Sequence, residues 1–302
     1  MKKRAKTAFQ LLVSAAQAWN TDNAFKHSAA VSFYTLFSLA PVTIIAITIM
    51  GVFLGQEIAT RQFTSQMTAL VGPASAEMIN AAAKASQSPA ANGFSSVLGI
   101  FLLILGATTV FGQLQDSLND IWGVKAKPRG HGIIVLVVRR LVSFAMVLTI
   151  GFLLLVSLVL STMLTAAFVR VHGQTGTESL LVKSIDFGAT LLVITLLFAL
   201  MFKVLPDVKL RWRDVWLGAL LTSGLFGAGR YLIALYLAHS TVASIYGTAA
   251  SLVALLIWIY YSCAIFFYGV EFTRAQHIAQ RPAVEPKPTA VHIRRRAGTE
   301  TR

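Results

Sequence analysis

Long apolar stretches separated by short charged segments run through most of the chain. Six of these stretches reach the length of about eighteen residues at which a helix can span a bilayer. They cover residues 29–54, 94–112, 141–168, 185–205, 215–238 and 246–272. Lipid offers no hydrogen-bond partners, so each span must satisfy its own backbone amides as a helix. The pattern therefore predicts an all-α, polytopic membrane protein with six transmembrane helices in one domain, residues 29–272.

The segment before the first apolar stretch has an amphipathic pattern instead. Behind the basic start MKKRAK, apolar residues recur at helical spacing: Phe9, Leu12, Val13, Ala16 and Trp19. An apolar stripe beside basic residues is typical of a helix that lies in the membrane interface. We therefore assign residues 1–28 to a cytoplasmic arm with an interfacial helix, and we expect Thr21 or Asp22 to cap the helix that follows.

The loop at residues 55–93 is the longest between the predicted spans, and it contains helical patterns of its own. The first pattern consists of Ile58, Phe63, Met67 and Leu70, and the second of Met78, Ile79 and Ala82. A structureless loop of this length would be unusual, so we expect short external helices. The end of the chain is rich in proline and arginine, and residues 273–302 are expected to form a disordered, basic cytoplasmic tail.

Composition supports the membrane class, and the charge distribution gives it an orientation. The chain has 302 residues, of which 56% are hydrophobic and only 13% charged, and its net charge is +14. The arm, the second loop, the fourth loop and the tail hold five, five, four and seven Lys or Arg residues, whereas the other loops hold two, two and none. This alternation predicts that both termini are cytoplasmic in a bacterial inner membrane. This distribution favours membrane lipids over nucleic acid as the partner of the basic residues. The oligomeric state stays open.

The residues that usually carry catalysis or bind metals are sparse. Cys263 is the single cysteine, so a disulfide within the chain or a CxxC site is excluded. The six histidines are scattered and show no metal-binding spacing. Asp116 and Asp120 lie one helical turn apart, but without a third ligand a solvated helix face is the simpler interpretation. We therefore expect no cofactor, no metal site and no enzyme activity, nuclease activity included.

Two cytoplasmic segments contain ordered patterns. Within FGQLQDSLNDIWGV, one predicted helix face carries Phe111, Leu114, Leu118 and Ile121. In LPDVKLRWRDVWLGAL, Pro206 is expected to end the fourth span, and Trp212 and Trp216 are expected to anchor the fifth span at the interface.

The first span contains a row of hydroxyl groups next to a proline. Ser32, Thr35 and Ser38 lie on or near one helix face, and Pro41 predicts a kink because it lacks the amide that would bond to the preceding turn. One interpretation is a broken helix that lines a polar substrate cavity, as in secondary transporters. The other is a kinked helix whose hydroxyls satisfy neighbouring backbone groups within a packed bundle.

The fifth span contains one ionic residue, Arg230. If this helix enters from the cytoplasm at Val215, Arg230 lies about 22 Å across the bilayer. A cation at that depth usually faces the bundle interior beside a partner. The acid expected at a similar depth is Asp186, at the outer start of the fourth span, whereas Glu271 lies near the cytoplasmic end of the sixth span. Facing inward, Arg230 would bind an anionic headgroup or phosphate; facing outward, it would reach toward the external interface.

The same span carries small residues at four-residue spacing, namely Ala219, Ser223 and Gly227. Such a ladder lets two helix backbones approach closely. We predict that it packs the helix of Arg230 against a neighbouring span.

Several motifs together resemble one family. AAVSFYTLFSLAPV, LQDSLNDIWGV, LPDVKLRWRDVWLGAL, STVASIYGTAASLVALLIWIYYS and GVEFTR are similar, in order and spacing, to the YihY/BrkB family of bacterial inner-membrane proteins, over about residues 20–275. The resemblance implies six helices with both termini in the cytoplasm. The family once carried the name ribonuclease BN, and it has been linked to serum resistance and to export of lipid or envelope components.

Three functions are compatible with these features. The first is a transporter or flippase-like protein for a lipid or another anionic envelope component, which would use Arg230, Asp186 and the hydroxyl row. The second is a scaffold that binds envelope machinery through its external loop without transporting anything. The third, a ribonuclease or hydrolase, is disfavoured because the 12 acidic residues are dispersed.

Overall fold

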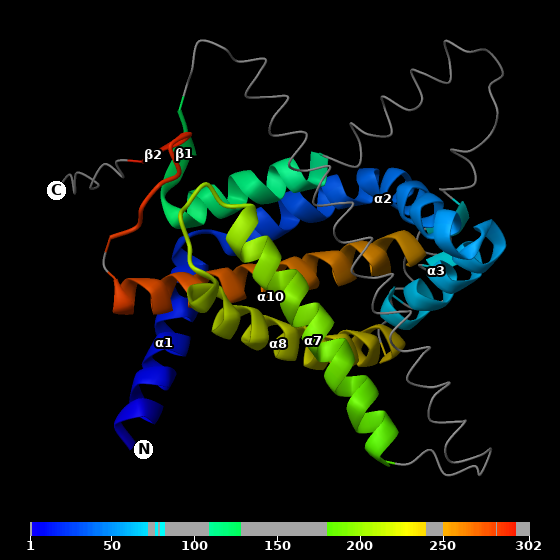
Figure 1. Ribbon diagram of the computed structural model, residues 1–302, viewed down its shortest axis with the longest axis horizontal. Coiled ribbons are helices and arrows are strands. Elements are labelled where there is room, and N and C mark those ends of the chain that lie inside the picture. The colour runs from blue at the N-terminus through cyan, green and yellow to red at the C-terminus, as the bar shows by residue number, and fades with distance from the viewer. Residues whose placement is uncertain are drawn as a thin grey trace.

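The computed structural model describes residues 2–71, 76–77, 79–81, 109–127, 180–239, 250–281 and 283–293. Its helices are α1 (Lys2–Thr21), α2 (Ala24–Leu54), α3 (Gln56–Val71), α7 (Leu180–Val204), α8 (Trp212–His239) and α10 (Ala250–Gln280) (Figure 1). A further helical segment covers residues 109–122. Two short strands, β1 (Val124–Ala126) and β2 (Ala290–His292), form one small sheet. Most of the second predicted span and the whole third span lie outside the described residues.

Four predicted spans correspond to α2, α7, α8 and α10. Within the described residues, Leu252–Gln280 is long and apolar enough to cross a membrane by itself. The bent pair Ala24–Leu39 and Val42–Leu54 adds a second span if it is counted as one. The apolar part of α7, Thr190–Val204, is shorter. The number of six spans therefore stays a prediction.

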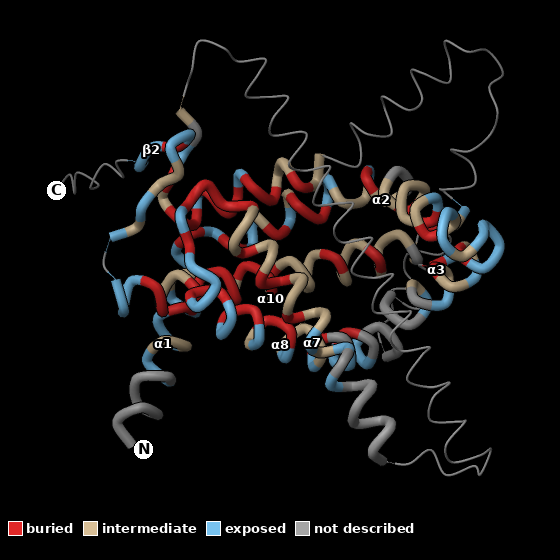
Figure 2. The backbone as a smooth tube through the Cα atoms, viewed as in Figure 1, coloured by how far each residue is buried: buried red, intermediate tan, exposed pale blue. Residues whose placement is uncertain are grey.

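α10 is the central helix of the described part. α8, α2 and α1 pack against it, and α7 packs against α8 (Figure 1). Phenylalanine rings fill the junction: the ring centroids of Phe202 and Phe266 are 5.1 Å apart, and those of Phe266 and Phe267 are 5.4 Å apart. Figure 2 shows that buried positions follow α10 and the helix faces beside it. Because α10 contacts most other helices, residues on its surface can join elements that are distant in sequence.

Glycine and threonine residues interlock α8 with α10. A Cβ atom added at Gly218 would collide with the Thr273 hydroxyl, and one at Gly269 would collide with the Thr222 hydroxyl. Both hydroxyls are oriented by bonds within their own helices, Thr222 to Gly218 at 2.7 Å and Thr273 to Gly269 at 2.8 Å. Each helix therefore presents a glycine to the other helix's threonine, and the two backbones approach closely.

A two-residue connection, Asp22 and Asn23, turns the chain from α1 into α2. Asn23 has a φ of 56°, in the left-handed region that asparagine tolerates better than most residues. The expected cap was wrong, because Asn23 is the N-cap residue of α2 and its side chain makes no capping bond. Trp19 fixes this corner to α10 by donating its indole N–H to the Ala264 carbonyl at 3.0 Å.

α2 bends by 53° between residues 39 and 42. The kink that Pro41 predicts is thus present, since proline cannot donate the backbone hydrogen bond to the preceding turn. Beyond the bend, Ile47 and Met50 of α2 form a second buried cluster with Ala59 and Phe63 of α3.

α3 supplies part of the helical cap that was expected in the 55–93 loop. Phe63 and Ile79 are buried, but Ile58 is 60% exposed. Ile58 lies off the buried stripe of α3, which is centred on Ala59 and Phe63, one turn apart on another face.

The segment at residues 109–122 has the predicted buried face. All four of its predicted apolar positions are buried, namely Phe111, Leu114, Leu118 and Ile121. Asp116 and Asp120 are exposed on another face.

The structure corrects the expectation of a disordered tail for residues 273–302. α10 continues to Gln280, and β2 then pairs antiparallel with β1, with Lys125 opposite Val291. Val208 forms a further bridge to Pro286. Composition suggested disorder, but main-chain bonds to a distant segment order this stretch as far as residue 293, and their strength depends little on side-chain type.

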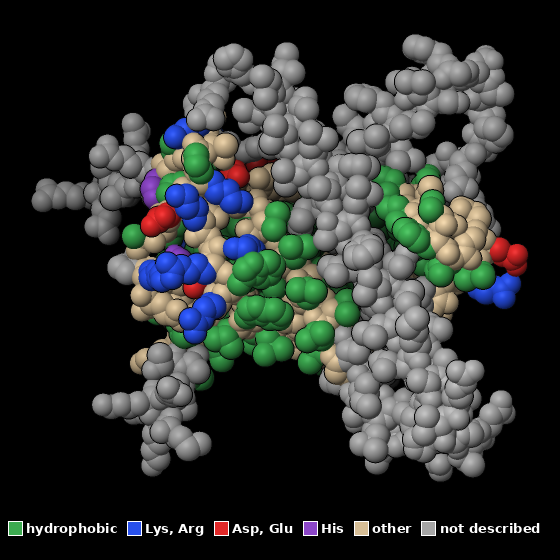
Figure 3. Space-filling view, viewed as in Figure 1, with side chains coloured by type: hydrophobic (Ala, Val, Ile, Leu, Met, Phe, Trp, Pro, Cys, Tyr) green, Lys and Arg blue, Asp and Glu red, His purple; other side chains and the backbone are tan. Residues whose placement is uncertain are grey.

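Basic side chains gather at the end of the described part where α10 ends and the strands lie (Figure 3). The connection between α7 and α8 contributes Lys209, whose Nζ is 3.8 Å from Glu285 Oε2 beyond the end of α10. α7 ends at Val204, just before Pro206, as the sequence predicts. The sidedness of the membrane itself stays a prediction.

Candidate functional site

The hydroxyl row predicted on α2 is engaged within that helix. Ser32 and Ser38 are buried, and Thr35 is half-buried. Ser32 donates to the Ala29 carbonyl at 2.9 Å and Thr35 to the Val31 carbonyl at 2.7 Å. Ser38 donates to the Thr35 carbonyl at 3.0 Å. These donors favour the interpretation of a packed, kinked helix over a cavity lined by free hydroxyl protons.

Arg230 lies in α8 and Asp186 in α7, but the side chains of both, and that of Pro41, lie outside the described residues. The register of the two helices follows from Ser223 and Thr195, whose hydroxyl oxygens are 2.7 Å apart. Arg230 lies seven residues after Ser223, and Asp186 lies nine residues before Thr195. At a helical rise of about 1.5 Å per residue, the heights of Arg230 and Asp186 along the two helices differ by about 3 Å. The pairing of Arg230 with Asp186 stays a prediction.

The small residues of α8 lie at two different surfaces. Ala219 and Ser223 are buried, and Ser223 contacts α7 through Thr195. Gly227 is half-buried, with open space where a Cβ would stand. Close approach to α10 is made elsewhere, at Gly218.

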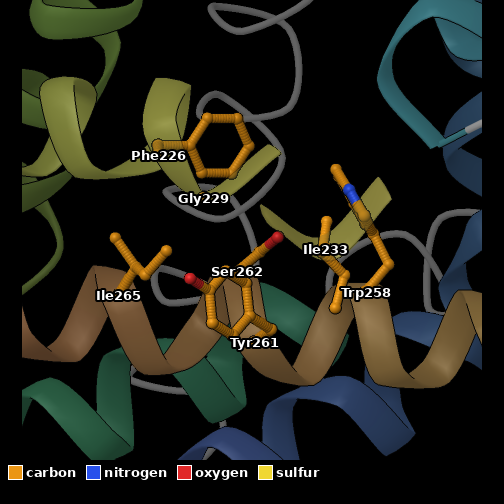
Figure 4. A pocket seen from close by; sticks show the side chains of 7 residues that line it. All are labelled: Phe226, Gly229, Ile233, Trp258, Tyr261, Ser262 and Ile265. Carbon is orange, nitrogen blue, oxygen red and sulfur yellow. The ribbon is translucent and has the colours of Figure 1, made fainter. Parts of the chain in front are cut away.

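A narrow crevice lies farther along the interface between α8 and α10 (Figure 4). Phe226 and Gly229 of α8 face Trp258 and Tyr261 of α10 across it. A Cβ at Gly229 would come within 2.8 Å of Tyr261 Cε1, so the helices are already in close contact. The crevice has no room for a water molecule and is a packing feature, not a ligand site.

A wider groove lies between α1 and the first half of α8. Its volume is about 480 Å³. Its lining is apolar throughout: Leu12, Leu217, Leu220, Leu221, Gly224, Leu225 and Phe272. Arg213 is exposed one helical turn before Leu217 and lies on the same face of α8, because positions 213, 217, 220 and 224 follow helical spacing. The open apolar groove thus has a basic residue at one end.

A buried charged cluster, Asp22, Glu271 and Arg274, lies where α10 meets the corner between α1 and α2. Nη1 of Arg274 is 2.7 Å from Asp22 Oδ2 and 3.3 Å from Glu271 Oε2. Glu271 is only 1% exposed. Its other oxygen, Oε1, is buried without a hydrogen-bond partner among the described residues. One guanidinium therefore serves two buried carboxyl groups.

A second pair joins α8 to α10 near this cluster. Nδ1 of His277 is 3.4 Å from Asp214 Oδ2, and the His277 ring meets the Trp122 ring edge-on with centroids 5.7 Å apart. Asp214 also accepts the backbone N–H of Arg211 at 3.0 Å, which closes the first turn of α8. The carboxylate of Asp214 is thus committed to holding the start of the helix.

Asp207 organises a third group of contacts beyond the end of α7. Asn119 donates its side-chain amide to Asp207 at 2.9 Å and accepts the Asp207 backbone N–H at 2.8 Å. Lys287, after α10, donates to the Val204 carbonyl at 3.0 Å. Burial lowers the pKa of Lys287, and the charge of Asp207 opposes that effect. These contacts tie three distant segments together at the basic end.

Within the described part of the chain, no group of three or more His, Cys, Asp or Glu side chains is placed to hold a metal ion.

Comparison with known proteins identifies the family. The family described as "Virulence factor BrkB" matches residues 15–293. The chain belongs to the BrkB family. The match includes the groove and the charged cluster except for Leu12, and it confirms the resemblance seen in the motifs. This BrkB-family chain is accordingly an all-α integral membrane protein.

Curated relatives are named as membrane proteins. A UPF0761 membrane protein of Alkalilimnicola ehrlichii is 28% identical over 86% of this chain and 56% of its own length. One of Tolumonas auensis is 29% identical over 58% of this chain and 56% of its own length. One of Alteromonas mediterranea is 26% identical over 83% of this chain and 82% of its own length. The chain thus spans about half the length of the first two relatives. No solved structure matches the chain.

The charged cluster of this BrkB-family chain was not predicted as a site. Its signal in the sequence was the pair Glu271 and Arg274, opposite charges three residues apart near the end of an apolar helix. The third member, Asp22, could not be predicted from the sequence, because it lies 252 residues before Arg274 and only the packing of the corner on α10 brings the two together.

Proposed function

We propose that this BrkB-family protein is a transporter or flippase-like protein for a lipid or another anionic component of the cell envelope. The observation that carries the proposal is the apolar groove between α1 and α8. An acyl chain fits such a lining, and Arg213 next to it offers a guanidinium to an anionic headgroup. The favoured substrate is therefore an amphipathic anion.

Features away from the groove agree with this proposal. α2 is bent, as helices beside transporter substrate paths often are. Ionisable residues in membrane helices are costly and commonly belong to substrate or ion pathways. On this proposal Arg230 and Asp186 extend the path across the bilayer.

The proposal is tested by filling the groove. We expect wild-type protein in proteoliposomes to accelerate the transbilayer movement of a fluorescently labelled anionic phospholipid above that in protein-free vesicles. Leu220→Trp should reduce the protein-dependent rate about tenfold, equivalent to about 1.4 kcal/mol, because the larger ring occupies the groove. Chemical quenching of the outer-leaflet label measures the rate.

Leu192→Trp is the matched control, since Leu192 is exposed on α7 and does not line the groove. It should leave the rate unchanged. Vesicles with wild-type protein that move the lipid no faster than empty vesicles would count against the function, and equal rates in the two tryptophan variants would count against the groove.

The alternative is a scaffold for envelope machinery that transports nothing. What favours it is the exposed apolar surface at the end of α2 and on α3, where Val52, Phe53 and Ile58 are all more than half exposed. A deletion of residues 56–92 that abolishes the cellular phenotype but leaves lipid movement intact would support the scaffold.

A further inference from the structure

Glu271 is a buried acid with an unused oxygen. Its side chain is 1% exposed, and Oε1 has no hydrogen-bond partner among the described residues. Its other oxygen has only a long contact, 3.3 Å, to a guanidinium that lies 2.7 Å from Asp22. A buried carboxylate without full hydrogen bonding or a charge partner of its own is strongly disfavoured, and a proton removes its charge.

The groups that face this end of α10 come from every element packed against it. They are Asp22 of the corner, His27 of α2, Asp214 of α8, and Arg274 and His277 of α10 itself, while the exposed Asp120 and Lys26 act on His27. Asp22 and Arg274 are the ones that act on Glu271, and the Asp22 carboxyl group is also close enough to share a hydrogen bond with the Glu271 carboxyl group once one of them holds a proton. Asp214 accepts a hydrogen bond from the start of α8 and lies 3.4 Å from His277 Nδ1. Arg274 is thus the cation shared by two acids.

We infer that Glu271 is a proton-binding site that controls how firmly the corner between α1 and α2 is held on α10. When Oε1 takes up a proton from water, Arg274 is left to pair with Asp22 alone. When the proton returns to water, two carboxylates compete for one guanidinium. The corner is then held less firmly and depends more on its other anchors on α10, the Trp19 indole and the Tyr268 hydroxyl that bonds to Leu12 in the wall of the groove.

Proton binding at Glu271 would add a regulatory step to the proposed function. The role of that proton in transport rests on the proposed function. The binding of the proton itself can be measured without any transport. Infrared spectroscopy distinguishes a protonated carboxyl group from a carboxylate by its carbonyl stretch. A failed lipid-movement assay would therefore leave the proton site standing, and the reverse also holds.

The experiment uses the full chain in lipid nanodiscs. We expect wild-type protein to retain a carboxylic acid band near neutral pH that shifts in D₂O and is lost in Glu271→Gln. Asp22→Asn keeps the buried acid but removes its competitor, so the band should then require more acidic buffer. Glu57→Gln is the control, because Glu57 is 87% exposed on α3 and pairs with Arg61, and the band should be unchanged.

Two results would overturn the inference. One is a folded wild-type protein with no such band near neutral pH, a result that needs no variant to fold. The other is a band that persists in Glu271→Gln. A band that does not change in Asp22→Asn would overturn the sharing of Arg274.

Discussion

At the scale of single residues, Arg274 joins the corner between α1 and α2 to the far end of the sequence on α10. Its guanidinium contacts Asp22 at the corner and Glu271 on its own helix, and it is only 22% exposed. Such a group adds little net stability when complete, because desolvating the charges offsets their attraction. Removing one member is different, since the remaining charges stay buried without compensation.

Arg274→Ala should therefore lower the free energy of unfolding by about 3–5 kcal/mol. Thermal unfolding in detergent, followed by intrinsic fluorescence, measures the change. Arg61→Ala is the control: Arg61 is exposed and pairs with Glu57 within one turn of α3, so its loss should leave stability almost unchanged. Equal melting of the two variants would show that the cluster does not hold the corner.

At the scale of elements, the contact between α8 and α10 depends on having no side chain at two positions. Gly269 shows this best: a Cβ there would collide with the Thr222 hydroxyl and would lie 3.2 Å from Phe202 Cζ. Within lipid, close packing of backbones replaces the hydrophobic effect as the force that joins helices. The spacing of α8 and α10 in turn sets where Asp214 meets His277.

Gly269→Ala should destabilise the protein by about 1–3 kcal/mol, because the added methyl group forces the helices apart. Gly224→Ala is a matched change in α8, where nothing lies within 4 Å of the new Cβ. It should be neutral or stabilising, as alanine favours helix over glycine by up to about 1 kcal/mol. Unfolding experiments on both variants measure the difference, and a tolerant Gly269 would refute the interlock.

At the scale of the whole molecule, the basic side chains at one end agree with the charge alternation in the sequence (Figure 3). The groove opens near this end, so the proposed headgroup contact at Arg213 belongs to the cytoplasmic leaflet if the alternation holds. Sidedness thus decides which leaflet supplies the substrate.

Topology is tested with reporter fusions. Alkaline phosphatase fused after residue 75 should be active, because the segment is expected outside the cytoplasm where that enzyme folds. A fluorescent protein fused to the C-terminus should fluoresce, because that end is expected in the cytoplasm. The opposite outcome at either position would reverse the depth assigned to Arg230.

Local patterns were predicted well where one face or one residue decides them. The buried face of residues 109–122, the end of α7 before Pro206 and the bend of α2 follow from periodicity and from the missing amide of proline. The tail was misjudged because strand pairing between β1 and β2 depends on a distant partner. Asp22 was misjudged as a cap because its carboxylate pairs with Arg274, 252 residues away.

The sequence by itself determined that this protein is a helical membrane protein, because lipid imposes long apolar runs that are visible without any knowledge of packing. Its ordered motifs pointed to the BrkB family, which the family match confirms. The tertiary structure decided which side chains form sites. Only the crossing of α1, α2 and α8 over α10 brings Asp22 to Arg274 and Leu12 to Leu220. Charge pairing and groove formation act across space at a few ångströms, and sequence distance does not predict them.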